Sequence, residues 1–487
     1  MRLRDKKRGI LMPLASLPSD HGIGDLVSSS FKFIDFLSDS GVDCWQLLPL
    51  VPLGKGNSPY YSVSCYAGEP LYIDLKELAK DGLLSISDID YKYNKDYIDY
   101  DEVREKKYYY LFKAFKSFDS ENRDFIKFQK ENKFWLEDYA VFCTAAEEYG
   151  HLKFFDDGLK YRLFDRLNEF KAINSEKISF YKTVQYFFYR QFFKMKAYAE
   201  KRGIKLIGDI PFYISDNSTE LWQNPQYFKL NRDLTPSFIA GVPPDIFSKT
   251  GQLWGNPVYD FEIMKKDGYL WWKNRIEHQK KLYDIIRIDH FRAFANYYEI
   301  SATEETALNG KWVSGPAEDF FKTLNKSIKL PPIIAEDLGG EDDKDVQRLL
   351  KNTGYPGMKV LEFCFEKIND PKSVPKSFPY NCVCYTGTHD NDTVAGWFSK
   401  LSAKEKVLAG RYIDINSSVP VSEQVIKYAN SLNIKMVIIP LSDYLNLDSG
   451  ARINTPGTST GNWIWRAKEE YLSKSVSDKI KRLINRK

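Results

Sequence analysis

Histidine and cysteine are scarce in this chain, and their scarcity argues against a metal centre. The 487 residues include five His and six Cys, and no two cysteines form a CxxC pair. Zinc sites take most of their ligands from these two residue types at short, regular spacings. The cysteines are instead scattered through apolar stretches, as expected of free thiols. We therefore predict no metal site and reduced thiols, which favours a cytoplasmic location.

An excess of one charge and a long apolar segment are also missing. There are 70 Lys and Arg against 66 Asp and Glu, so the net charge is only +4. Surfaces that bind nucleic acids are strongly basic, and this balance argues against a nucleic-acid partner. The apolar run near the start is broken at Pro13. It is too short to span a membrane and lacks the end of a cleaved signal, which argues against membrane attachment and export.

Aromatic residues, by contrast, are abundant. Ten Trp, 32 Tyr and 32 Phe make up 15% of the chain. Rings in this number can fill a large core, and they can also line a site for ligands that stack on them, such as sugars. The chain is long enough for one large barrel with insertions or for two to three domains.

Short apolar segments predict strands that alternate with helical patterns. Eight such segments are centred near residues 10, 46, 207, 287, 334, 360, 384 and 437. Eight β/α units is the number that closes a parallel barrel. We therefore predict an α/β fold, a (β/α)8 TIM barrel with inserted, largely helical subdomains, in which residues 1–487 form a single catalytic unit.

Two long stretches interrupt the alternation of strands and helices. Residues 76–200 are rich in Lys, Glu and aromatic residues in helical patterns, which predicts a mostly helical insertion. Residues 211–284 are rich in Gly, Pro and Asn, which predicts a loop-rich insertion over the active site. A loop region of this length inside a compact domain usually serves function.

Carboxylates directly follow four of the predicted strands. They are Asp209, Asp289, Glu336 and Asp390. The C-terminal ends of the strands of a parallel barrel lie on one face, so we expect these acids to meet on one rim. Arg287 shares a strand face with Asp289 and would keep this carboxylate ionised. Each acid alone is more often structural, but several acids on one rim indicate a functional site.

Paired carboxylates without a metal are typical of glycosyl transfer. One carboxylate attacks the anomeric carbon of a sugar. The other has a raised pKa, protonates the leaving oxygen, and later takes the proton of the incoming hydroxyl. A magnesium site made of carboxylates alone is the alternative that these residues leave open.

Motifs in a fixed order along almost the whole chain point to one family. They are Ser19–Asp25, Asn57–Tyr60, Gly208–Pro211, Ala240–Asp245, Gly251–Pro257, Arg287–Arg292, Glu336–Gly339, Tyr355–Lys359, Gly387–Thr393 and Gly461–Arg466. With these motifs the sequence resembles the amylomaltases, the 4-α-glucanotransferases (disproportionating enzymes) of the α-amylase clan. The resemblance implies a (β/α)8 barrel with inserted subdomains and neither a metal nor an organic cofactor.

The resemblance also implies a reaction and its partners. The partners are malto-oligosaccharides and other α-1,4-glucans, and a glucan segment moves between them by a retaining double displacement through a covalent glucosyl-enzyme intermediate. Asp289 would be the nucleophile, Glu336 the general acid/base and Asp390 the stabiliser of the transition state. The implied substrate-binding residues are Ser58, Tyr60, Asp209, Gln252, Trp254, Arg287, His389 and Asn462. His290 is left out, because in an extended strand it would face away from Asp289.

The chain departs from the family's usual residues in four places. Ala293 stands where Gly is usual, Tyr61 where Gln is usual, Glu69 where Asn is usual, and Ser442 where Gln is usual. None of these departures removes a predicted catalytic acid. They bear instead on the preferred donor length and on any second glucan site.

Two other functions fit the same residues. A hydrolase of the same clan would use the same acids with water as the acceptor, and a non-catalytic barrel would bind glucan without reaction. We expect Glu336 to be protonated near neutral pH, because Asp289 stays ionised beside Arg287. Retention further predicts that the two carboxyl groups lie roughly 5–5.5 Å apart.

Overall fold

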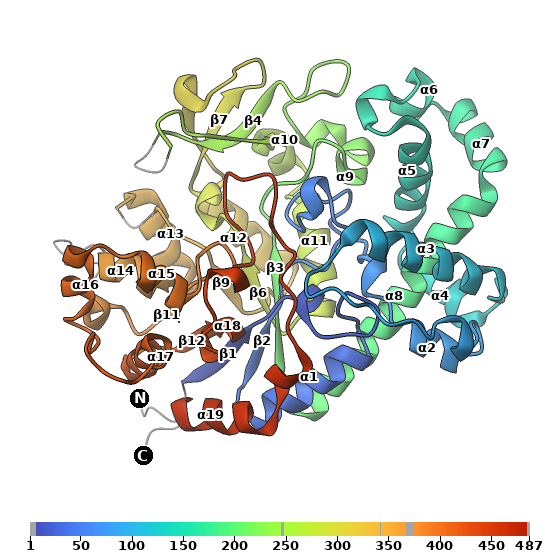
Figure 1. Cartoon of the computed structure of the whole chain (residues 1–487). Coiled ribbons are helices and arrows are strands. Elements are labelled where there is room, and N and C mark those ends of the chain that lie inside the picture. Colours follow the sequence, from blue (N-terminus) through green and yellow to red (C-terminus); the bar gives the residue numbers. More distant parts are fainter. Residues whose placement is uncertain (1–5, 245–247, 341, 367–373, 485–487) are drawn as a thin grey trace.

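A computed structural model of the chain describes residues 6–244, 248–340, 342–366 and 374–484 (Figure 1). Its centre is a sheet of eight parallel strands in the order β10-β11-β12-β1-β2-β3-β6-β9. A hydrogen bond of 2.9 Å from Ala335 N–H to the carbonyl of Pro356 links β9 to the start of β10, so the sheet curls into a barrel. The strands are β1 (Lys7–Leu11), β2 (Cys44–Gln46), β3 (Lys205–Ile210), β6 (Ile285–Ile288), β9 (Ile333–Ala335), β10 (Gly357–Val360), β11 (Cys382–Tyr385) and β12 (Met436–Pro440).

These eight strands coincide with the eight apolar segments of the sequence, and the predicted (β/α)8 fold is confirmed. Every residue of β2, β9, β11 and β12 is buried. A parallel strand covered on both faces needs apolar side chains at successive positions, not at alternate ones. This is why short apolar runs, without alternation, identified the barrel strands.

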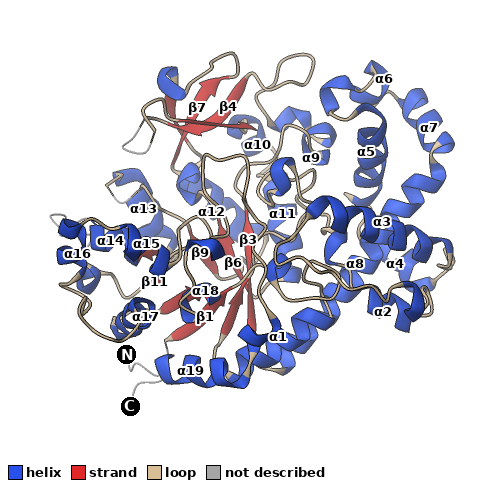
Figure 2. Ribbon diagram, viewed as in Figure 1, coloured by secondary structure: helices blue, strands red, loops and turns tan. Residues whose placement is uncertain are grey.

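Helices cover the outside of the barrel (Figure 2). Asp343 begins α13 by accepting hydrogen bonds from the N–H groups of Asp345 and Val346, and Gly354 ends it in the left-handed conformation, at φ +70°. The first and last helices, α1 and α19, pack against each other. The covering helices are α1 (Ser28–Asp39), α11 (Leu270–Leu282), α12 (Ala317–Ser327), α13 (Lys344–Thr353), α14 (Leu361–Glu366), α15 (Val394–Lys400), α16 (Ala403–Ala409), α17 (Val421–Ser431), α18 (Leu441–Tyr444) and α19 (Lys474–Ile484).

In the segment between β2 and β3, the regular elements are all helices, joined by loops. Its longest helix, α8, has 27 residues and buries an aromatic face against α3, α4 and α5. The aromatic run Tyr186–Tyr189 of α8 therefore lies in the core, whereas Tyr109 and Phe112 of α3 are exposed. Its helices are α2 (Leu75–Lys80), α3 (Tyr100–Lys116), α4 (Arg123–Glu131), α5 (Leu136–Tyr149), α6 (Asp157–Lys160), α7 (Phe164–Ile173) and α8 (Ser175–Lys201).

A second, antiparallel sheet lies apart from the barrel strands and is drawn above them in Figure 2. Its order is β5-β4-β7-β8, and two of its strands come from residues before β6 and two from residues after it. The remaining short helices before β6 are α9 (Thr219–Gln223) and α10 (Phe261–Lys266). The strands of this small sheet are β4 (Phe238–Val242), β5 (Gln252–Pro257), β7 (Asn296–Ser301) and β8 (Lys311–Ser314). Asp245, the end of one sequence motif, lies outside the described residues.

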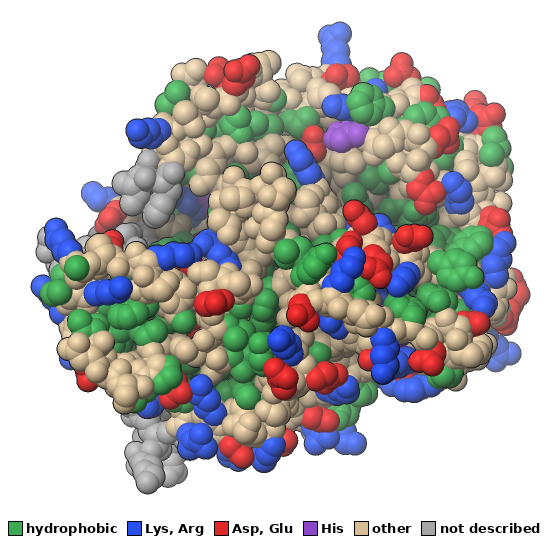
Figure 3. All heavy atoms as spheres, in the orientation of Figure 1, with side chains coloured by type: hydrophobic (Ala, Val, Ile, Leu, Met, Phe, Trp, Pro, Cys, Tyr) green, Lys and Arg blue, Asp and Glu red, His purple; other side chains and the backbone are tan. Residues whose placement is uncertain are grey.

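The surface carries both signs of charge side by side. Figure 3 shows Lys and Arg interspersed with Asp and Glu over one face of the molecule, in keeping with the small net charge. None of the helices in the described ranges has both the length and the apolar composition needed to cross a membrane.

Candidate active site

The predicted pair of Arg287 and Asp289 forms an ion pair at the end of β6. Asp289 follows the last strand residue, Ile288, and its N–H donates to the carbonyl of Ile210 on β3, at 3.0 Å. An Nη2 to Oδ1 distance of 2.9 Å joins Arg287 to Asp289. Arg287 is buried, while the Asp289 side chain is 30% exposed. The carboxylate can therefore meet a ligand while the guanidinium holds it from behind.

Asp209 binds the same arginine from the neighbouring strand. Nη1 of Arg287 lies 2.7 Å from Oδ1 and 2.6 Å from Oδ2 of Asp209. The hydroxyl of Tyr60 donates to Oδ2 at 2.8 Å. Asp209, which the sequence predicted as a site residue, therefore lies in the hydrogen-bonded network around Arg287.

Glu336 follows β9 and is only 9% exposed. Its Oε2 accepts a hydrogen bond from His290 N–H and its Oε1 one from Leu338 N–H, both at 2.8 Å. Burial, followed by the nearby Asp289 carboxylate, raises the pKa of Glu336 to about 8, against the opposing effect of Arg287 and the two N–H groups. Glu336 is therefore protonated at neutral pH, as the sequence predicted.

The pKa of Asp289 is also displaced upward. Burial raises it, and the ion pair with Arg287 opposes this without reversing it. Arg287 therefore favours the charged form of Asp289, as the sequence predicted, and burial, which the sequence did not show, acts against it. The guanidinium contacts Asp289 directly, at 2.9 Å.

Asp390 lies in the loop after β11, and its side chain is 45% exposed. Its Oδ1 accepts a hydrogen bond of 2.6 Å from Nδ2 of Asn454 and lies 3.3 Å from Nε2 of His389. Arg452 donates to the Asp390 carbonyl at 2.7 Å. Asp390 also acts electrostatically on Asp289. The three predicted acids therefore meet on one rim.

Aromatic rings form one wall beside these acids. Tyr60 and His389 stack with ring centroids 4.9 Å apart and planes 10° apart. Trp463 contacts both rings, at 5.9 Å from Tyr60 and 6.0 Å from His389. The buried Nδ1 of His389 has no hydrogen-bond partner among the described residues. This nitrogen and the rings around it are suited to a polar ligand with flat faces.

The other predicted binding residues make different contacts around the site. Ser58 accepts a hydrogen bond of 3.2 Å from Tyr60 N–H and so supports that tyrosine. Trp254 donates to Gln252 Oε1 at 3.2 Å, and its ring meets the His290 ring edge-on at 4.8 Å. Asn462 instead ties together its own loop, because its amide accepts from Thr455 N–H and donates to the carbonyl of Thr458.

Three residues outside the predicted set belong to this site. They are His290, Asn454 and Trp463. The strand rule excluded His290, but β6 ends at Ile288 and the rule does not apply beyond it. Trp463 lies within the motif Gly461–Arg466, and that position was the available signal. Asn454 stands 64 residues from its partner Asp390, and the sequence held no signal for it.

Two of the residues that depart from the family's usual ones, Tyr61 and Glu69, make hydrogen bonds in the structure. Tyr61 donates to Oδ1 of Asp216 at 2.6 Å. Glu69 is buried and accepts from the N–H groups of Leu53 and Leu71, at 2.6 and 2.9 Å. Tyr61 and Glu69 therefore shape the loop that carries Tyr60.

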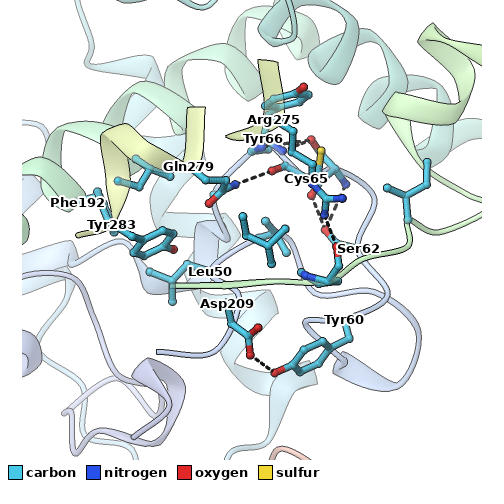
Figure 4. A pocket seen from close by; sticks show the side chains of 18 of the residues that line it. Leu50, Tyr60, Ser62, Cys65, Tyr66, Phe192, Asp209, Arg275, Gln279 and Tyr283 are labelled. Carbon is cyan, nitrogen blue, oxygen red and sulfur yellow. Dashed lines mark hydrogen bonds between the residues drawn. The ribbon is translucent and has the colours of Figure 1, made fainter. Parts of the chain in front are cut away.

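A small cavity of about 30 Å³ adjoins Tyr60 and Asp209 and continues between β3, α8 and α11 (Figure 4). It has room for one or two water molecules. None of the three predicted catalytic acids is among the described residues that line it. Arg275, at its far end, donates to the carbonyls of Pro211 and Phe212 at 2.6 and 3.1 Å, and so fixes the loop after β3. The cavity belongs to the support of the site.

Metal ligands are not grouped in this site. In the parts of the chain that the structure describes, no three His, Cys, Asp or Glu side chains are placed to hold a metal ion.

Comparisons with known proteins point to one family. The family model described as 4-alpha-glucanotransferase matches residues 12–472. The 4-alpha-glucanotransferase of Clostridium butyricum is 40% identical over 480 residues, which cover 97% of this chain and 98% of the relative. That of Aquifex aeolicus is 42% identical over 484 residues, which cover 98% of each chain. A solved structure of amylomaltase from Streptococcus agalactiae in complex with acarbose is similar with a TM-score of 0.95, at 37% identity over 98% of both chains.

Proposed function

The chain belongs to the family of 4-alpha-glucanotransferases, and from this premise we propose which residues carry out the transfer. The protein transfers an α-1,4-glucan segment between malto-oligosaccharides by the retaining double displacement of its family. The observation that carries our assignment is the difference between two neighbouring acids. Asp289 is paired with Arg287, whereas Glu336 has a pKa of about 8 and holds a proton.

In the first step, Asp289 is the nucleophile. One of its carboxylate oxygens attacks the anomeric carbon, and the bond from this carbon to the glycosidic oxygen breaks. Glu336 gives its proton to the leaving oxygen, which departs as the 4-hydroxyl of the released glucan. The donor segment remains joined to Asp289 through an ester bond, and Glu336 is left as a carboxylate.

In the second step, Glu336 is the base. The 4-hydroxyl of an acceptor glucan attacks the anomeric carbon, its proton passes to Glu336, and the ester to Asp289 breaks. Two inversions give net retention, and both acids return to their starting charges. This route predicts carboxyl groups roughly 5–5.5 Å apart, and a separation of about 6.5 Å or more would contradict it.

The remaining groups bind the sugar at the point of cleavage. Asp390 is exposed enough to contact it and is held by Asn454, which suits a carboxylate that stabilises the developing positive charge. Tyr60 and His389 offer a stacked pair of rings beside it. Trp254, on strand β5 of the small sheet, packs against His290 next to the catalytic acids. Acarbose, which the solved relative binds, is a ligand of the kind expected here.

We also propose that the chain is a single catalytic unit in which residues 76–200 and 211–284 are inserted segments, the second of which ends with the barrel helix α11. One continuous cluster of buried apolar side chains, which joins the barrel to the helical segment, supports the single unit. The six cysteines carry free thiols, which supports a cytoplasmic location.

Incubation with maltotriose tests the transfer. We expect glucose together with a ladder of longer chains, while the number of reducing ends stays constant. A steady rise of reducing ends would instead show water as the main acceptor and would favour the hydrolase. The absence of any new product would favour a glucan-binding barrel without catalysis.

The variant Asp289→Asn tests the nucleophile. Removing the attacking oxyanion is expected to lower kcat at least 10³-fold. The matched variant Asp216→Asn changes an acid that accepts a hydrogen bond from Tyr61, in the loop that carries Tyr60. This variant is expected to keep measurable transfer. Full activity of Asp289→Asn would refute the assignment.

A further inference from the structure

The backbone leaves the strand conformation directly after Asp289. Strand β6 ends at Ile288, and His290 adopts the left-handed conformation, with φ 52° and ψ 41°. This region is unfavourable for most side chains with a Cβ, and among residues other than Gly it is enriched in Asn, Asp and His. A left-handed residue directly after the nucleophile Asp289 is therefore a feature to explain from its contacts.

The left-handed turn directs two N–H groups at Glu336. The N–H of His290 donates to the carboxyl Oε2 at 2.8 Å, and the N–H of Phe291 donates to the carbonyl of Glu336 at 2.9 Å. Leu338 N–H holds the other carboxyl oxygen. With an extended residue 290, the N–H groups of residues 290 and 291 would point to opposite sides, and they could not both reach Glu336. The position of the Glu336 carboxyl thus depends on the conformation of His290.

The imidazole of His290 is held by two rings from other elements. Trp254 on β5 meets it edge-on, with centroids 4.8 Å apart and planes at 83°, and Tyr213 in the loop after β3 lies at 6.0 Å. Burial, together with the positive charge of Arg292, lowers the pKa of His290 to about 3. The ring is therefore neutral at working pH and carries no proton between substrates.

We propose that His290 is a positioning residue for the general acid: its left-handed backbone directs two successive N–H groups at Glu336, while its ring adds a contact with Trp254 and Tyr213 that this backbone does not require. The inference rests on the assignment of Glu336 as the acid/base. It links the small antiparallel sheet, through Trp254, to the group that protonates the leaving oxygen.

The hydrogen bond has a predictable electrostatic effect. An N–H that donates to a carboxyl group favours its charged form. Asp289 opposes that charge and Arg287 favours it, while His290 itself is neutral. Loss of the His290 N–H is therefore expected to raise the pKa of Glu336 further and to release its side chain.

Substitutions at this one position distinguish the effect of the backbone conformation from the effect of the ring. His290→Asn removes the imidazole but tolerates the left-handed conformation, and His290→Gly adopts it freely. His290→Val removes the ring and resists the conformation, because a β-branched side chain is a genuine outlier there. The pH profile of kcat/KM reports the pKa of Glu336 in the free enzyme as its alkaline limb.

We expect the alkaline limb of His290→Asn to stay within about 0.3 pH unit of the native enzyme, and that of His290→Val to move up by about one unit. The kcat of His290→Val should also fall at least about 10-fold below that of His290→Asn. Limbs that move equally in both variants, or in neither, would overturn the proposal. If His290→Val does not fold, His290→Ala replaces it, with His290→Gly as the permissive partner.

Glu336→Gln distinguishes failure of this inference from failure of the proposed function. If that variant keeps its transfer activity, the assignment of Glu336 is wrong. If it loses activity while the Asn and Val variants behave alike, only the positioning role of His290 is wrong.

Discussion

Arg287 organises the site because its guanidinium reaches two carboxylates at once. Nη1 binds both oxygens of Asp209, and Nη2 binds Asp289. A planar fork with fixed donors can do this, while a single ammonium group cannot hold both partners in the same geometry. The burial of the guanidinium also makes the loss of either partner costly. The orientation of the nucleophile is therefore set by one side chain.

The variant Arg287→Lys keeps the charge but loses the fork. We expect a decrease of kcat on the order of 10²-fold, because Asp289 would lose its fixed partner. The KM for maltotriose should change much less, because the aromatic wall and Trp254 remain. Steady-state kinetics of native and variant enzymes measure both quantities, and a kcat within twofold of the native value would contradict the argument.

Glu336 makes the stability of the fold depend on pH. Its pKa rises from an ordinary value of 4.5 to about 8, so the folded state binds the proton more tightly than the unfolded state between these values. Stabilisation by this group is therefore fully present below its unfolded pKa and is lost as the pH rises through about 8. The neutral variant Glu336→Gln does not undergo this loss.

We expect the melting temperature of Glu336→Gln, relative to the native protein, to increase from pH 5 to pH 9. Thermal unfolding at several pH values measures the difference. Glu131→Gln, which changes an exposed acid on α4, serves as the control and should show no such trend. A difference that stays constant with pH would mean that Glu336 titrates normally.

At the scale of elements, the loop after β11 is fixed from its two ends by one buried acid. Asp443 on α18 accepts from the Thr386 hydroxyl at 2.6 Å and from the N–H of Val394, the first residue of α15, at 2.9 Å. His389 and Asp390 lie between these two anchor points. A short helix that carries no catalytic residue thus determines where the catalytic loop sits.

The variant Asp443→Leu should disturb this loop at a distance from the chemistry. Two buried donors would lose their acceptor, which is expected to cost about 2–4 kcal/mol of free energy of unfolding and to lower kcat. Asp443→Asn keeps one acceptor oxygen and should lower both the free energy of unfolding and kcat by less than Asp443→Leu does. Denaturant unfolding and maltotriose kinetics provide the test, and native values for Asp443→Leu would show that the loop is held elsewhere.

At the scale of the whole molecule, the barrel and the helical segment share one core. Helix α8 fixes the segment between β2 and α2 by two similar contacts: Gln185 binds the N–H and the carbonyl of Gly68, and Gln191 binds those of Asp74. Both amides are buried. The segment that carries Tyr60 therefore depends on a helix that precedes the next barrel strand.

We expect thermal unfolding in a single transition, because one continuous apolar core joins the barrel to the helical segment. Gln185→Leu should lower the free energy of unfolding by about 1–3 kcal/mol and leave the single transition intact. Gln129→Leu, a half-exposed position on α4, is the control and should have little effect. Calorimetry that resolves two transitions in the native protein would show independent domains.

The sequence by itself determined the barrel and its acids. Strands buried on both faces must be apolar at successive positions, so each was readable from a few neighbouring residues, and the acids stood directly after them. The motif order then fixed the family. The small sheet was less visible, because its strands are partly exposed and lie on both sides of β6 along the chain.

Only the tertiary structure decided how these acids work. The left-handed turn at His290, the hydrogen bond from Asn454 to Asp390 and the wall of Trp463 each depend on contacts between distant segments. The raised pKa values of Asp289 and Glu336 have the same origin, since burial is a property of the folded surroundings. Local pattern selects the residue type at a strand end, but desolvation and orientation arise only when the strands, the small sheet and the loops come together.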